Sequence, residues 1–87
     1  MSNKYAQIPD HTIDLHGYTT SEAERELGAL LKIGQYKHIR IITGSGVQHF
    51  GPVLRDFVKN YLNARSIRFN AAKREHGGDG ALEVFIR

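Results

Sequence analysis

The sequence of 87 residues contains no cysteine. Disulfide bonds and zinc sites with cysteine ligands are therefore excluded. No stretch approaches the roughly 20 consecutive apolar residues of a membrane-spanning helix, and residues 1–9 contain no apolar run of signal-peptide length. The chain also has no internal repeat and no low-complexity segment. We therefore expect no membrane partner and a cytoplasmic location.

Acidic residues are fewer than basic ones, 9 against 12, and the sequence pI is about 9.5. The resulting net charge of +3 favours a polyanionic partner such as nucleic acid, although such an excess also serves solubility. Hydrophobic residues make up 40% of the chain, which fits one small soluble domain with a modest core. Residues 1–10 are polar and aperiodic, so we predict a flexible N-terminal tail there and a folded domain over residues 11–87.

The hydrophobic periodicity predicts four strands and two helices. Alternating residues predict strands over residues 12–16, 38–43, 66–73 and 81–87. The first helix begins after the capping residues Thr19–Ser21 and ends at Gly34, and the second begins near Pro52 and ends near residues 63–65. Strands separated by helices are normally parallel, and two helices cover only one face of a sheet. We therefore predict an α/β fold, a two-layer βαβαββ sandwich whose other sheet face is open.

The segment Ile13–Gly17 is the first candidate site. In a strand, Ile13 and Leu15 would face the core, and Asp14 and His16 would share the opposite face. An aspartate that orients a histidine is a recurring arrangement in acid–base catalysis. Read alone, the segment fits an ordinary edge strand with a polar outer face equally well.

Three glycine-containing segments follow the predicted strands. These are His16–Gly17, the turn Thr43–Gly46 and the loop His76–Gly80. The carboxyl ends of parallel strands share one edge of a sheet, where ligands of open α/β sheets bind. Free N–H groups at the start of the second helix could receive a phosphate there. The alternative is that each glycine only permits a tight turn.

The open sheet face should be rich in basic side chains. By alternation it should carry Asp14, His16, His38, Arg40, Arg68, Asn70, Arg74, Phe85 and Arg87, with Glu83 reducing the positive charge. Such a face suits a nucleic-acid backbone with occasional base stacking, and a solvated polar face would look similar. His16, His49 and His76 could approach one another, with Asp14 or Asp79, but no pair has the spacing of a dedicated metal motif, so no metal site is predicted.

Four sequence blocks together resemble the Smr (small MutS-related) domain family. They are Asp14–Gly17, Thr43–Gly46, Gly51–Arg55 and Gly77–Ala81, and the resemblance covers about residues 12–87. It implies a fold like the C-terminal domain of bacterial translation initiation factor three, a four-stranded mixed sheet whose last strand runs antiparallel between the second and third. It also implies nucleic-acid binding, with endonuclease activity in many members, as DNA nicking or RNA cleavage.

The resemblance also implies residue roles. Asp14 and His16 match the pair associated with cleavage, and the turn Thr43–Gly46 matches one thought to contact nucleic acid. The residues expected to bind nucleic acid, including the basic pair Lys73 and Arg74 placed by their charge, are Gly17, Thr43, Gly44, Ser45, Gly46, His49, Lys73, Arg74, Gly77, Gly78 and Gly80. Position 45 often holds Lys or Arg in the family, so Ser45 removes one phosphate contact.

The leading interpretation is an Smr-type endonuclease, with structured DNA or RNA as partner and a chain compatible with a monomer. RNA cleavage requires a base for the 2′-hydroxyl, a role open to His16 with Asp14 orienting it. DNA nicking requires activated water and a divalent metal such as Mg or Mn. The alternatives are a non-catalytic nucleic-acid-binding module that recruits a larger repair or ribosome quality-control machine, and a protein–protein adaptor.

Overall fold

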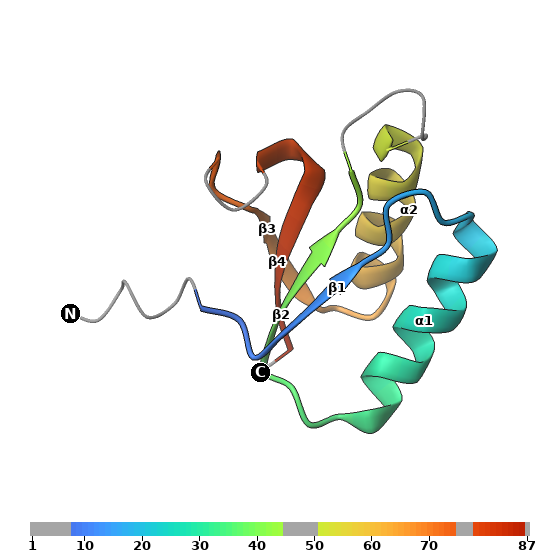
Figure 1. The fold of residues 1–87 in the computed structure, drawn as a ribbon. Coiled ribbons are helices and arrows are strands. Elements are labelled where there is room, and N and C mark those ends of the chain that lie inside the picture. The colour runs from blue at the N-terminus through green and yellow to red at the C-terminus, as the bar shows by residue number, and fades with distance from the viewer. Residues whose placement is uncertain (1–7, 45–50, 75–77, 87) are drawn as a thin grey trace.

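The computed structural model describes residues 8–44, 51–74 and 78–86. Figure 1 shows a sheet with both long helices on one side of it. The elements in chain order are β1 (His11–Asp14), α1 (Thr20–Ile33), β2 (His38–Ile42), α2 (Gly51–Ala64), β3 (Arg68–Ala71), the short 3₁₀ helix η4 (Gly78–Gly80) and β4 (Ala81–Phe85). The predicted order βαβαββ is thereby confirmed.

The sheet has the strand order β1-β2-β4-β3. β1 pairs with β2 in parallel, whereas β4 lies antiparallel between β2 and β3. The predicted two-layer α/β sandwich with a mixed sheet and an antiparallel last strand is confirmed. Insertion of β4 places its beginning beside the end of β2, with Ala81 opposite Ile42, and its end beside the start of β2, with Phe85 opposite His38.

Helix α1 begins and ends where its sequence predicts. The Thr19 hydroxyl accepts a hydrogen bond from the Glu22 N–H at 3.1 Å, and the Glu22 carboxylate accepts one from the Thr19 N–H at 2.9 Å. This capping box satisfies two N–H groups that have no partner within the helix. Gly34 ends the helix with φ at 70°, a left-handed conformation that glycine adopts without steric cost.

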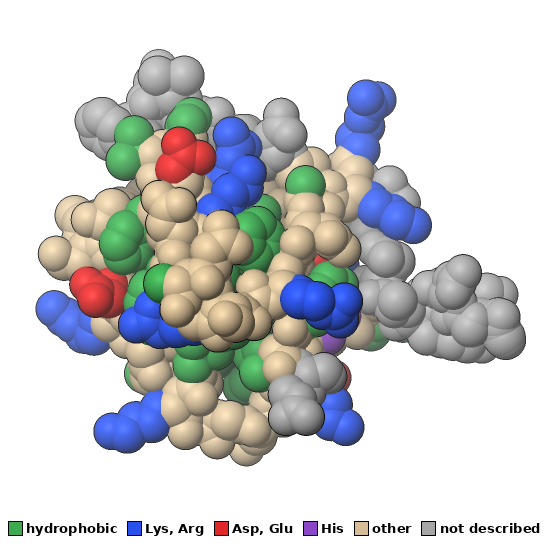
Figure 2. Space-filling view, turned by 180° about the vertical axis from the view of Figure 1, so that it is seen from behind, with side chains coloured by type: hydrophobic (Ala, Val, Ile, Leu, Met, Phe, Trp, Pro, Cys, Tyr) green, Lys and Arg blue, Asp and Glu red, His purple; other side chains and the backbone are tan. Residues whose placement is uncertain are grey.

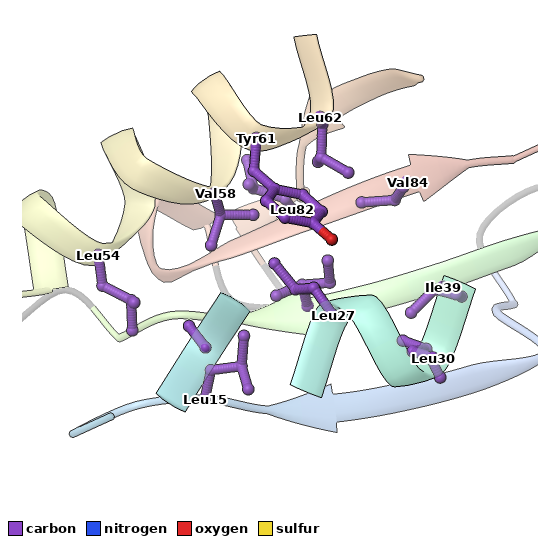
Figure 3. Close-up of a cluster of buried hydrophobic side chains, with 12 residues drawn as sticks. Leu15, Leu27, Leu30, Ile39, Leu54, Val58, Tyr61, Leu62, Leu82 and Val84 are labelled. Carbon is purple, nitrogen blue, oxygen red and sulfur yellow. The ribbon is translucent and has the colours of Figure 1, made fainter. Parts of the chain in front are cut away.

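The hydrophobic core lies between the helices and one face of the sheet. Figure 3 shows Leu27 of α1 and Val58 of α2 pointing toward Leu82 of β4. All three side chains are at most 1% exposed. Leu15 is fully buried although it follows the last residue of β1. The core thus anchors the segment that carries His16, directly after Leu15.

Several element boundaries differ from their predictions. β3 spans only Arg68–Ala71, because the preceding residues close α2: the Ser66 N–H donates to Asn63 O and the Ile67 N–H donates to Leu62 O. Ala71, predicted on the core face, is exposed. Residue 87, predicted in the last strand, lies outside the described residues.

The predicted tail also ends earlier than residue 10. The Asp10 N–H donates to His38 O at 2.7 Å, and its carboxylate accepts from the N–H groups of Lys37 and His38 at 2.8 and 3.1 Å. These bonds lower the pKa of Asp10 below its ordinary value, with Lys37 the larger cause. Asp10 therefore belongs to the folded domain, whereas residues 1–7 lie outside the described residues.

Within the described residues, neither α1 nor α2 has the length and apolar character needed to cross a membrane.

Candidate active site

Asp14 and His16 form a hydrogen-bonded pair at the carboxyl end of β1. Asp14 Oδ1 accepts from the His16 backbone N–H at 3.0 Å and contacts His16 Nδ1 at 2.7 Å. An ionised carboxylate only accepts hydrogen bonds, so Nδ1 carries the hydrogen and Nε2 holds a free lone pair. The His16 side chain is 60% exposed. A ring held at one nitrogen and open at the other can exchange a proton with a bound substrate.

The two side chains meet for a different reason than strand alternation. Sequence periodicity placed both on one face of a strand running to His16. The structure ends β1 at Asp14, and the chain then bends so that a single carboxylate oxygen binds the backbone and ring of the residue two positions on. The predicted proximity is confirmed, but its predicted cause is wrong.

The contact with His16 also tunes the carboxyl group. The hydrogen bond from the His16 ring, followed by the one from the His16 backbone N–H, holds the pKa of Asp14 below its ordinary value of 3.8. Both bonds favour the ionised form, because a carboxylate accepts them better than a carboxylic acid. Asp14 is therefore negatively charged throughout the neutral range and can stabilise a protonated imidazole.

Two glycines with left-handed backbone flank the His16 side chain. Gly17 follows it directly with φ at 81°, and nothing lies within 4 Å of the position that a Cβ would occupy. Gly44 has φ at 83°, and a Cβ there would lie only 3.2 Å from His16 Cβ. The Thr43–Gly44 turn is therefore close behind His16, and only glycine fits without displacing the histidine.

The turn after β2 is tied to the loop before β4. Gly80 O accepts hydrogen bonds from the N–H groups of Thr43 and Gly44 at 2.8 and 3.0 Å, and the Thr43 hydroxyl lies 3.4 Å away. These bonds confirm that the segments around His16, Gly44 and Gly80 meet at one edge of the sheet. Thr43 is fully buried and Gly80 is buried. Their polar groups join the two segments, and contact of either residue with nucleic acid stays a prediction.

The remaining predicted binding residues are only partly placed. Lys73 and Arg74 are exposed on the connection that follows β3, and Lys73 O accepts from the Gly78 N–H at 2.9 Å. This connection leads into η4 and so to Gly80 at the edge described above. Four further predicted residues, Ser45, Gly46, His49 and Gly77, lie outside the described residues, and no role is assigned to them from the structure.

No metal site is formed by the part of the chain that the structure describes, because no three His, Asp or Glu side chains gather there. Of the histidines considered from the sequence, His16 is paired with Asp14. The other two candidates, His49 and His76, and the side chain of Asp79 lie outside that part.

A buried carboxylate on the open sheet face was missed by sequence reasoning. Glu83 of β4 is only 3% exposed, although the helices cover the opposite face. Its two oxygens contact His38 Nε2 at 2.5 Å and Arg40 Nε at 2.6 Å. His38, interpreted from the sequence as a surface residue, has a side chain only 12% exposed. Opposite charges at Arg40 and Glu83, which face each other across β2 and β4, were the available signal, but reading it required the register of the two strands.

On the face seen in Figure 2, Lys and Arg side chains project at several separate places and acidic side chains are few. This distribution agrees with the net charge of +3. It favours approach of a polyanion to the domain.

Comparison with known proteins identifies the family. The Smr domain family model matches residues 13–87. Ribosome rescue factor SmrB of Vibrio cholerae is 34% identical over 83 residues, and that of Tolumonas auensis is 33% identical over 84. These alignments cover 91% of this chain but only 43% and 46% of the two relatives, so the chain spans less than half of their length.

A solved structure agrees with the same assignment. The crystal structure of the Smr domain of Thermus thermophilus MutS2 superposes with a TM-score of 0.76 at 26% identity, covering 88% of this chain and 98% of that domain. Both the sequence blocks and the strand order therefore have counterparts in one family. The chain belongs to the Smr domain family.

Proposed function

We propose that this domain is an endonuclease that cleaves RNA, with the Asp14–His16 pair as its acid–base centre. The observation that carries the proposal is the double hydrogen bond from His16 to Asp14 Oδ1, which leaves an exposed ring with Nε2 free to accept a proton. None of the described residues donates a hydrogen bond to that nitrogen. A positioned histidine of this kind is the commonest general base in enzymes.

The reaction needs only the RNA, the Asp14–His16 pair and water. Nε2 of His16 takes the proton from a ribose 2′-hydroxyl, and the 2′-oxygen forms a bond to the neighbouring phosphorus. The bond from phosphorus to the 5′-oxygen then breaks, that oxygen takes a proton from water, and the imidazolium returns its proton to the hydroxide left behind. The products are a 2′,3′-cyclic phosphate and a 5′-hydroxyl end. The ionised Asp14 stabilises the imidazolium formed in the first step.

We assign phosphate binding to exposed cations at the same end of the sheet as the pair. Lys73 and Arg74 are exposed cations on the connection that reaches the same edge through η4. The positive charge of the chain would draw the nucleic acid toward that edge. Relatives named ribosome rescue factors support RNA over DNA as the partner. DNA nicking is the other branch, and it would require Mg or Mn to activate a water.

The proposal is tested by incubating the purified chain with structured RNA and with supercoiled DNA, each in chelator and with added Mg or Mn. We expect RNA cleavage in chelator and fragments with 2′,3′-cyclic phosphate ends. His16→Ala should lower the cleavage rate by about 100-fold or more, the usual scale for one acid–base group. Asp14→Asn should also lower it, and the double variant should be little slower than the slower single variant.

Matched controls separate catalysis from folding. His11→Ala removes a histidine at the opposite end of β1, and Asp56→Asn removes an exposed carboxylate on α2. Both should cleave at the rate of the unmodified chain. Cleavage unaffected by His16→Ala would refute the catalytic role. RNA binding without cleavage would favour a non-catalytic nucleic-acid-binding module. Nicking of DNA only with added metal would favour a metal-dependent DNA endonuclease. Absence of nucleic-acid binding would favour a protein–protein adaptor.

A further inference from the structure

A hollow lies at the edge of the sheet formed by β3, away from the Asp14–His16 pair. Its volume is about 580 Å³, within the range of small-molecule sites. The polar groups lining it come from the end of α2 and from the two last strands: Asn63, Ser66, Arg68 and Asn70, with the ring of Phe85 beside them. Arg68 and Phe85 lie directly opposite each other across β3 and β4.

The ring of Phe85 is the centre of a stacked arrangement. The imidazole of His38 lies on it with ring centroids 4.8 Å apart and an interplanar angle of 29°. The guanidinium of Arg68 lies over it at 5.7 Å. Arg68 is exposed, whereas Phe85 is half-buried. A planar cation held over an aromatic ring offers its outer face to a further flat group, such as a nucleobase.

On the open face, the basic side chains in the middle of the sheet contact an acidic group, whereas Arg68 at the end of the sheet contacts an aromatic ring. His38 and Arg40 are both engaged by the buried Glu83, so these two basic side chains are matched by an acidic one. Arg68, at the end of the sheet where β3 starts, lies over an uncharged ring and retains its charge for a phosphate. The amides of Asn63 and Asn70 can donate to and accept from the edges of a base.

We propose that this hollow is a second nucleotide subsite, which takes a base of the RNA strand bound at Asp14 and His16. The proposal rests on the proposed function. β4 links the two places: Gly80 before it joins the segment behind His16, and Phe85 ends it. Four residue steps along β4 span about 14 Å, and the three strand spacings from β1 to β3 add about 14 Å across the sheet, so the two places lie about 20 Å apart, the length of about six stacked nucleotides.

Length dependence of binding tests the subsite directly. The probes are single-stranded 2′-O-methyl oligoadenylates of two to eight nucleotides, which lack the 2′-hydroxyl needed for cleavage. For the unmodified chain we expect affinity to rise in a step once the probe is long enough to reach both places. Arg68→Gln should remove that step and lower affinity for the longest probe about tenfold, within the range measured for loss of one stacked base, while leaving the shortest probes unaffected.

Arg25→Gln is the matched control, because it removes the same charge from an exposed position on α1. Phe85→Leu, checked for folding by its melting temperature, should act as Arg68→Gln does. Equal weakening by Arg68→Gln and Arg25→Gln would overturn the subsite, since only overall charge would then matter. Tight binding of the longest probe by the Arg68→Gln variant would also overturn the subsite. This strand edge would then be assigned to another class of partner, such as an extended peptide.

The subsite and the nuclease can fail separately. Cleavage of a short RNA that depends on His16, without any length step, would refute the subsite and leave the proposed function standing. A length step that depends on Arg68, in a chain that does not cleave RNA, would support the subsite and refute the nuclease.

Discussion

Removing the buried carboxylate of Glu83 should destabilise the domain more than any other single change on the open face. In Glu83→Ala, the Nε of Arg40 and the Nε2 of His38 each lose a short hydrogen bond to an ionised partner. Their side chains are only 15% and 12% exposed, so water replaces the lost oxygens poorly. The variant therefore leaves positive charge half-enclosed next to a new gap.

The expected loss is large for a chain of this size. Breaking a buried ion pair by removing one partner costs about 3–5 kcal/mol. At about 0.05–0.15 kcal/mol per residue, a chain of 87 residues has a total stability of roughly 4–13 kcal/mol. For a domain of this length each kcal/mol corresponds to about 4–8 °C in melting temperature. Glu83→Ala should therefore lower the melting temperature by at least about 12 °C.

Urea unfolding followed by circular dichroism measures the effect. Glu26→Gln, an exposed position on α1, is the control and should change stability by less than about 0.5 kcal/mol. A second variant replaces Glu83, Arg40 and His38 together by Leu, Met and Leu. Because neither Arg40 nor His38 then remains beside a missing carboxylate, it should cost less than Glu83→Ala alone.

A loss below about 1 kcal/mol in Glu83→Ala would refute the reasoning. That value is typical of exposed ion pairs, and it would mean that solvent reaches the carboxylate in solution. A triple variant less stable than Glu83→Ala would refute it in another way. The network would then contribute net stability as a unit, beyond the cost of leaving charges without their partners.

Two further predictions concern the candidate active site. Gly44→Ala and Gly17→Ala both force alanine into a left-handed conformation, at a cost of about 1–2 kcal/mol, but only the Cβ at Gly44 presses on His16. We expect similar melting temperatures and much slower RNA cleavage in Gly44→Ala alone; equal rates would contradict the close packing. The lowered pKa values of Asp10 and Asp14 mean that their stabilising effect is present above about pH 4 and lost as pH falls through the lowered values. Asp10→Asn/Asp14→Asn should flatten the dependence of urea midpoints on pH between 5 and 2, and an unchanged slope would contradict these shifts.

Local signals in the sequence predicted most of the fold. The capping box at Thr19, the left-handed Gly34 and the periodicity of both helices depend on neighbouring residues, so they can be read without knowing the tertiary structure. Boundaries of strands depend on their partners instead. Ser66 and Ile67 fit a strand by composition, but their N–H groups close α2, and this choice between helix end and sheet is decided by packing.

The sequence predicted which segments meet around His16, but it did not predict which polar groups in those segments are buried. Thr43 beside a glycine turn resembles a ligand-binding residue in the sequence, and the structure buries it against Gly80, a residue 37 positions away. Glu83 is a second residue whose burial the sequence did not predict. A glutamate in an alternating strand is expected on the solvent face, and its burial follows only from the two basic side chains that β2 places beside it.

The antiparallel position of β4 between β2 and β3 explains why the two ends of the molecule depend on each other. At its beginning, Gly80 O fixes the turn in which a Cβ on Gly44 would lie only 3.2 Å from His16 Cβ. In its middle, Glu83 joins β4 to β2 by two side-chain contacts, and at its end Phe85 stacks between His38 and Arg68. A strand held at three points along about 17 Å cannot shift in register at one end alone. The position of the His16 imidazole therefore depends on a strand whose far end carries the proposed nucleotide subsite, so both belong to one rigid surface.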